Sequence, residues 1–168
     1  MTTTLFAQPY DISATGFYFE TIEEYEACAA KAVNAYGQPV EEFEIQFIDG
    51  ERIDCELAEA IGLTQGNLRA FLECVDAWED WQKTNVIIAV GECGYPFDPK
   101  TDPQDYDVDV YAAESLRDLA MQFVDEGLFG EVPKPLAYYI DYDAIAHDLG
   151  TEYVETVIAG ERIVYACR

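Results

Sequence analysis

The 168-residue sequence is poor in basic side chains: it has nine lysines and arginines and one histidine against 34 aspartates and glutamates. The formal net charge of −25 is spread along the whole chain and not gathered in one block. Nucleic acid and anionic membranes are therefore excluded as direct partners, because the surface would repel both. The charge predicts a strongly basic partner, with adaptation to high salt as the alternative explanation.

Further absences narrow the possible functions. The five cysteines are widely spaced and form no CxxC pair, so we expect reduced thiols in a cytoplasm and neither a disulfide framework nor a zinc site. No apolar run reaches the ~18 residues that span a bilayer, and the start of the chain has no basic leader, which predicts a soluble cytoplasmic protein. Neither GxGxxG nor GxxxxGK[ST] occurs, so we expect no phosphate cradle and no cofactor.

The composition is nevertheless that of a folded protein. Half of the residues are hydrophobic and 14% are aromatic, which is enough to bury a core. The predicted fold class is α+β, with three small units. An N-terminal α+β unit covers residues 1–54, a central and mainly helical unit with a linker covers 55–104, and a C-terminal α+β unit with a three-stranded antiparallel sheet covers 105–168.

Residue patterns predict the elements of the first two units. The β-branched and aromatic stretches 16–20 and 43–48 predict strands, and a helix over 21–33 begins at Thr21 with Glu24 three residues later. A short helix over 55–62 ends at Gly62, and apolar residues at helical spacing predict a longer helix over 67–81. Residues 84–97 fit either helix or strand. The turn-rich stretch 98–104 predicts a linker.

Residue patterns in the last third of the chain also predict both strands and helices. Strict alternation predicts a strand over 105–111, and residues 113–127 predict an amphipathic helix that ends at Gly127. Residues 141–150 predict a short helix capped by Asp141. Residues 153–166 predict a hairpin that turns at Ala159 and Gly160.

No pattern of catalytic or metal-binding residues stands out. Asp105, Asp107 and Asp109 begin like a calcium-binding EF-hand loop, but Val110 stands where that loop needs glycine, and Leu116 stands where it needs glutamate. We therefore predict no metal site. These acids are expected on one face of a strand, where they could bind a basic groove of a partner.

Catalysis by the single histidine is equally unsupported. His147 has no nucleophile signature near it, and on a helix it would form a solvent-exposed i,i+4 pair with Asp143. We therefore predict that the protein is not an enzyme, although a chance pairing of carboxylates for acid–base chemistry stays open.

One long segment carries a specific resemblance. Residues 125–149, DEGLFGEVPKPLAYYIDYDAIAHDL, resemble the antirestriction motif of the ArdA family. The matching residues are Gly130, Glu131, Val132, Pro133, Leu136, Tyr139, Ile140, Asp141, Tyr142, Ala144, Asp148 and Leu149. The stretches GFYFETIEEYE and EEFEIQFID resemble the N-terminal part of that family more loosely. Family members often have arginine where this chain has His147, and residues 78–103 do not align.

The resemblance implies an elongated homodimer that mimics bent B-form DNA. Such a protein occupies the DNA-binding groove of type I restriction-modification enzymes and is carried by mobile elements whose incoming DNA it protects. Tyr138, Tyr139, Ile140 and Tyr142 are expected to pack or to form the dimer contact, and the whole motif organises the C-terminal unit. An inhibitor of another DNA-binding system, such as a CRISPR complex or a transcription factor, is the alternative.

Acids along the whole chain are expected to carry the inhibition, with no single one essential. On the predicted helix 67–81, three of them form a ridge. The predicted acidic surface comprises Glu41, Glu42, Glu44, Glu73, Asp76, Asp80, Asp98, Asp102, Asp105, Asp107, Asp109, Glu114 and Asp118.

Overall fold

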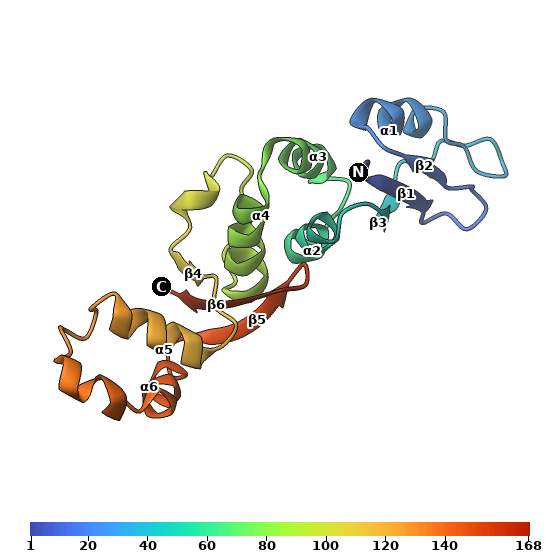
Figure 1. Ribbon diagram of the computed structural model, residues 1–168. Coiled ribbons are helices and arrows are strands. Elements are labelled where there is room, and N and C mark those ends of the chain that lie inside the picture. The colour runs from blue at the N-terminus through green and yellow to red at the C-terminus, as the bar shows by residue number, and fades with distance from the viewer. The chain divides into compact units, whose positions relative to one another are not determined.

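The computed structural model describes residues 1–168, and the chain divides into two compact units, Met1–Tyr106 and Asp107–Arg168 (Figure 1). Each unit contains one three-stranded antiparallel sheet, with the orders β2-β1-β3 and β4-β6-β5. The predicted α+β class with a C-terminal three-stranded sheet is therefore confirmed. The proposed boundary between residues 54 and 55 stays a prediction.

The first sheet is built around a strand that the sequence patterns did not reveal. Strand β1 (Thr4–Pro9) lies between β2 (Phe17–Phe19) and β3 (Phe43–Asp49), with Leu5 opposite Phe19 on one side and Ala7 opposite Ile45 on the other. Its alternating exposure is clear in the structure, because Leu5 and Ala7 are completely buried.

Helix α1 (Ile22–Ala29) covers this sheet through an aromatic cluster. Tyr25 lies 5.1 Å from Phe19 and 6.2 Å from Phe43, measured between ring centroids. The predicted N-cap is confirmed, since Thr21 Oγ1 accepts a hydrogen bond from the Glu24 backbone amide at 3.2 Å. The helix is shorter than the predicted 21–33 and ends at Ala29.

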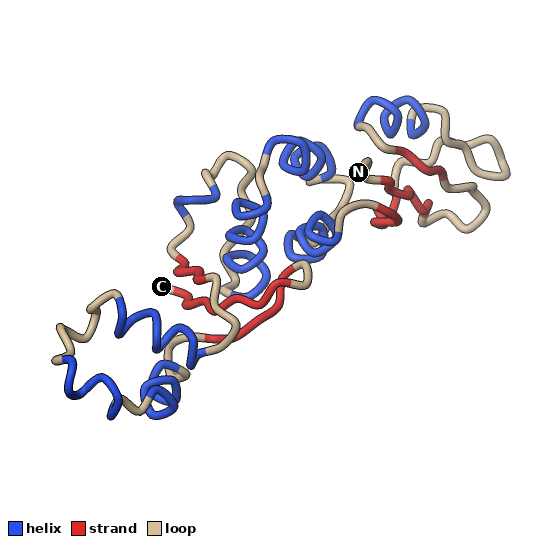
Figure 2. The backbone as a smooth tube through the Cα atoms, viewed as in Figure 1, coloured by secondary structure: helices blue, strands red, loops and turns tan.

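The rest of the first unit consists of helices joined by loops, as Figure 2 shows. It contains α2 (Arg52–Ile61), α3 (Leu68–Ala77), α4 (Asp80–Val86) and the π-helix η1 (Ile87–Glu92). Gly62 ends α2 with a φ of 63°, as its position predicted. The predicted helix 67–81 is wrong beyond residue 77, because Trp78 takes an extended conformation before α4 begins. The ambiguous segment 84–97 is helical through Glu92.

The short 3₁₀ helix η2 (Pro103–Asp105) precedes the second unit, whose sheet has the strand β6 (Glu161–Cys167) at its centre. Strand β4 (Val108–Tyr111) pairs with β6 on one side and β5 (Val154–Ile158) pairs with it on the other. The hairpin turns at Ala159 and Gly160, both with positive φ, in agreement with the prediction.

Helix α5 (Leu116–Asp125) packs on this sheet. Leu119, Phe123, Tyr153 and Val164 belong to one buried cluster, in which the Phe123 and Tyr153 rings meet edge to face at 5.8 Å. Helix α6 (Tyr142–Leu149) follows a 3₁₀ helix, η3 (Lys134–Tyr139), and neither contains a buried residue. The resembling motif therefore lies at the surface of the second unit.

Candidate interaction surface

The acidic side chains stay at the surface. Asp54 is the only acid among the buried residues, although the chain has 34 aspartates and glutamates. Every acid of the predicted surface is exposed except Asp109, which is half-buried. Burial of a carboxylate without a partner is costly, so the distribution is physically expected. It leaves nearly all of the negative charge accessible to a partner.

Most of the scarce basic side chains are used within their own unit. Five of the nine lysines and arginines form ion pairs, namely Arg52, Arg69, Lys83, Arg117 and Arg168. Each of these pairs joins two residues of the same unit. Five of the few basic side chains are therefore already paired with acids of their own unit. The outward field of each unit is therefore dominated by carboxylates.

The row of acids at the start of the second unit is not the continuous strand face that the alternation predicted. Asp105 ends η2, Asp107 precedes β4, and only Asp109 lies in the strand. Asp109 Oδ2 accepts a hydrogen bond from Arg168 Nε at 2.6 Å, so its charge is partly neutralised. Asp109 is therefore a poorer contact for a basic partner than its neighbours in the sequence.

Several acids of the predicted surface also hold local structure. Asp98 Oδ1 accepts from the Lys100 amide at 2.9 Å, Asp102 Oδ1 accepts from the Gln104 amide at 3.0 Å, and Asp118 Oδ2 accepts from Ser115 Oγ at 2.9 Å. Side-chain oxygens that bond nearby backbone amides are typical of turns and helix starts. These acids combine exposure with a defined orientation.

The structure adds two acids that the sequence patterns did not single out. Glu20 and Glu23, next to the start of α1, line an open cavity of about 530 Å³ together with Glu73 and Asp76 of α3. Ile22, Leu72 and Val75 supply apolar parts of its wall, and Arg69 also lines it while pairing with Glu26. Only the tertiary contact of α1 with α3 brings these acids together. The third acid of the predicted ridge, Asp80, begins α4 after the break at Trp78.

The segment that resembles the antirestriction motif, residues 125–149, runs from the end of α5 through η3 to the end of α6, and most of its residues are exposed. Gly130 has a φ of +94°, a conformation that favours glycine, and Pro133 caps η3. Tyr138 and Tyr139 are 95% and 83% exposed. Asp141 caps α6 as predicted, because its Oδ1 accepts from the Ala144 amide at 3.0 Å.

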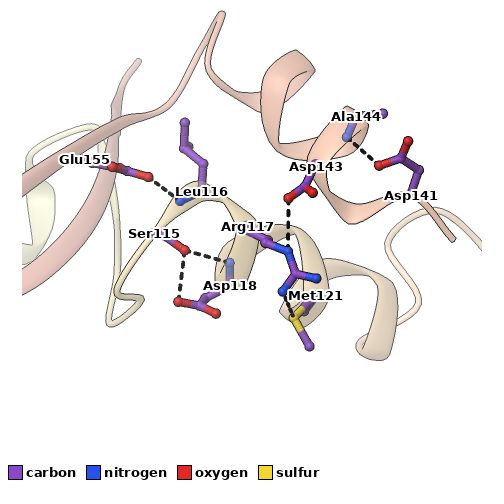
Figure 3. Close-up of polar contacts among 9 residues, drawn as sticks. All are labelled: Ser115, Leu116, Arg117, Asp118, Met121, Asp141, Asp143, Ala144 and Glu155. Carbon is purple, nitrogen blue, oxygen red and sulfur yellow. Dashed lines mark hydrogen bonds and ion pairs between the residues drawn. The ribbon is translucent and has the colours of Figure 1, made fainter.

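An ion pair between Arg117 and Asp143 joins helices α5 and α6. Figure 3 shows Arg117 of α5 directed at Asp143 of α6, where Arg117 Nε donates to Asp143 Oδ1 at 3.0 Å. The Arg117 guanidinium also lies 5.9 Å from the centre of the Tyr142 ring. Asp143 therefore pairs with Arg117, and the prediction of an Asp143–His147 pair is wrong.

The motif also borders an apolar cavity of about 340 Å³ within the second unit. Val132, Ile140 and Leu149 belong to the motif, and Val124 of α5 lines the same cavity from outside it. The exposed fractions of Leu136 and Phe129 are 55% and 59%. This arrangement places a hollow and projecting apolar side chains on the same unit.

No group of three or more histidine, cysteine, aspartate or glutamate side chains is placed to hold a metal ion. No helix combines the length and the apolar character needed to cross a membrane. Cys28, Cys55 and Cys74 carry free thiols.

Comparison with known protein families matches residues 5–161 to the family described as Antirestriction protein (ArdA). The chain belongs to the ArdA family. The match spans nearly the whole chain and includes this motif, so the resemblance first seen in residues 125–149 extends through both units. ArdA is a family of inhibitors and not of enzymes. A comparison with curated proteins gives no match.

Proposed function

We propose that this ArdA protein protects incoming mobile DNA in the host cytoplasm. It occupies the DNA-binding groove of a type I restriction-modification enzyme, where its carboxylates stand in for DNA phosphates. The observation that carries the proposal is the exposure of nearly all of the acids in a folded chain of net charge −25. A groove of lysine and arginine that binds B-DNA meets one negative charge per ~1.7 Å of helix axis, and a dense carboxylate surface engages the same side chains.

The mechanism is competition and involves no chemical step. Exposed carboxylates attract the basic groove, and the counterions held by both surfaces are released on contact. DNA and inhibitor then exclude each other because they use the same lysines and arginines. Inhibition should therefore depend on the ratio of inhibitor to DNA.

The test is a restriction and methylation assay with a purified type I enzyme. Addition of the protein should suppress DNA cleavage, and more DNA should restore it at a fixed inhibitor concentration. Methylation measured in the same reactions shows whether modification is suppressed too. Full cleavage at low salt with excess protein would contradict the proposal, and inhibition that added DNA does not relieve would contradict competition.

We also propose that the protein forms a homodimer through the motif of the second unit. Support comes from the apolar cavity and the exposed Leu136, Tyr138 and Tyr139 on one unit, because a symmetric dimer needs both a projecting and a receiving surface on each copy. Sedimentation of Leu136→Ser/Tyr139→Ser should show monomers where the unchanged protein shows dimers. A monomeric unchanged protein at micromolar concentration would refute this.

A further inference from the structure

Two loops at one end of the first sheet carry apolar side chains that nothing in their unit covers. They are residues 10–16, which join β1 to β2, and residues 30–42, which join α1 to β3. Figure 1 shows both loops projecting beyond the sheet, and the strand register places Pro9 beside Phe43 at that end. Tyr10, Ile12, Val33 and Tyr36 are 65%, 100%, 53% and 84% exposed. We call these side chains the apolar tip.

Hydrogen bonds fix the two loops against each other. Asn34 Nδ2 donates to Asp11 Oδ2 at 3.1 Å, and the Ala35 amide donates to Ser13 Oγ at 3.2 Å. Asp11 Oδ1 in turn accepts from the Ser13 amide and hydroxyl at 2.9 and 2.7 Å. The order of the loops thus comes from polar contacts, and the apolar tip is presented in a fixed arrangement without being buried. Single exposed apolar residues are ordinary, but a group held together on ordered loops marks an interaction site.

The charge around the apolar tip indicates what covers it. Before residue 41, Asp11 and Lys31 are the only charged side chains of the two loops, so their charges cancel in a chain of net charge −25. Glu41 and Glu42 follow at once and are exposed, and the Glu42 carbonyl accepts from the Tyr10 amide at 3.2 Å. The two loops thus combine exposed apolar side chains with two exposed acids where the second loop ends. Their complement is an apolar cleft with lysine or arginine at the rim.

We infer that the apolar tip docks into such a cleft on the protein whose DNA-binding groove the acidic surface occupies. The inference rests on the proposed function, because both contacts are made with the same enzyme. A second copy of this chain is a poor occupant, since it would bring Glu41 and Glu42 of both copies together. DNA has no counterpart of the apolar tip. The contact therefore distinguishes the enzyme from other proteins with basic grooves, which carboxylates alone do not.

The experiment measures the affinity for the purified type I enzyme, without DNA, over a series of salt concentrations. The double variant Ile12→Asn/Tyr36→Ser should bind about tenfold more weakly at every salt concentration, with an unchanged slope of log affinity against log salt. The matched control is Ile48→Asn, which alters another exposed isoleucine, 48% exposed, in β3 of the same unit. It should bind like the unchanged protein. The variant Glu41→Gln/Glu42→Gln should instead show a shallower slope of log affinity against log salt, because it removes two charges.

The outcomes separate a failure of the inferred docking from a failure of the proposed function. If the unchanged protein inhibits the enzyme and the tip variant binds equally well, the inferred docking is wrong while the proposed function stands. If the unchanged protein neither binds nor inhibits, the proposed function itself fails. If the tip variant instead changes the sedimentation of the protein alone, the occupant is a second copy. Because Ile12 and Tyr36 are largely exposed, the variants should keep the thermal unfolding midpoint of the unchanged protein, which circular dichroism checks.

Discussion

The Nζ atom of Lys83 in α4 lies 2.6 Å from Oδ1 of Asp54 in α2, and these two are the only charged side chains that are buried. Replacing one partner of a buried ion pair leaves the other charge without compensation, which costs about 3–5 kcal/mol. We expect Lys83→Met to lower the free energy of unfolding by this amount in urea denaturation. A loss below about 1 kcal/mol, within the range of surface pairs, would contradict this account.

Two further variants test whether the loss of stability comes from the buried ion pair. Arg52 and Glu56 form an exposed i,i+4 ion pair on α2, so Arg52→Ala should cost at most about 0.5 kcal/mol. The double variant Lys83→Met/Asp54→Leu removes both charges and should be less destabilised than Lys83→Met alone. Equal losses in the single and double variants would mean that the cost lies in packing and not in the unpaired charge.

The free thiols should differ in their reactivity. Burial, followed by the nearby Glu73, raises the pKa of Cys74 to about 11 from its ordinary 9.0. The reactive thiolate is thus about a hundredfold scarcer at any pH well below 9. Alkylation of the native protein at pH 8, followed by mass spectrometry, should label the exposed Cys28 first and Cys74 last. Labelling of Cys74 as fast as that of Cys28 would contradict the buried position of Cys74.

The loop network of the first unit should depend on pH through Asp11. Hydrogen bonds from the Ser13 hydroxyl, the Ser13 amide and Asn34 lower the pKa of Asp11 from its ordinary 3.8. A lowered folded-state pKa stabilises the fold above pH 3.8, and this contribution is lost as the pH falls through the lowered value. NMR titration of the Asp11 carboxyl should give a midpoint below 3.8. Asn34→Ala should raise the midpoint, whereas Gln46→Ala, in β3 of the same unit, should leave it unchanged.

The fold could be predicted where local signals agree. Local chemistry predicts the helix ends at Thr21, Gly62 and Asp141 and the turn at Ala159–Gly160, and the structure has all of them in the expected places. The sequence does not predict strand β1, because its stretch TLFAQP does not alternate clearly between apolar and polar residues. The sequence does not predict the break at Trp78, because apolar residues continue at helical spacing up to it.

The acidic surface could be predicted in composition but not in arrangement. Net charge alone indicates that the acids are exposed, because burying them costs too much. The gathering of Glu20, Glu23, Glu73 and Asp76 around one cavity depends on how α1 meets α3, and no local pattern encodes that contact. The ion pair of Asp109 with Arg168 likewise joins residues that are distant in sequence.

The inhibitory contribution of the acids should be graded. Asp76→Asn alone should change the inhibition of restriction less than about twofold, because a surface of many charges tolerates the loss of one. Charge reversal of Glu20, Glu23, Glu73 and Asp76 to lysine should weaken inhibition by well over tenfold. Asp109→Asn should have the smallest effect, since Arg168 already neutralises part of that charge. Loss of all inhibition in Asp76→Asn, with the fold intact, would indicate a discrete site instead of a distributed surface.

The central claim is that the acidic surface binds the basic DNA-binding groove of a type I restriction-modification enzyme. The most direct test is the dissociation constant of the complex between the purified protein and the DNA-free enzyme, measured by calorimetry from low to high salt. The account predicts tight binding at low salt and a steep linear fall of log affinity with log salt, as counterion release requires. An affinity that is independent of salt, or an enzyme that binds the protein and DNA at the same time, would contradict it.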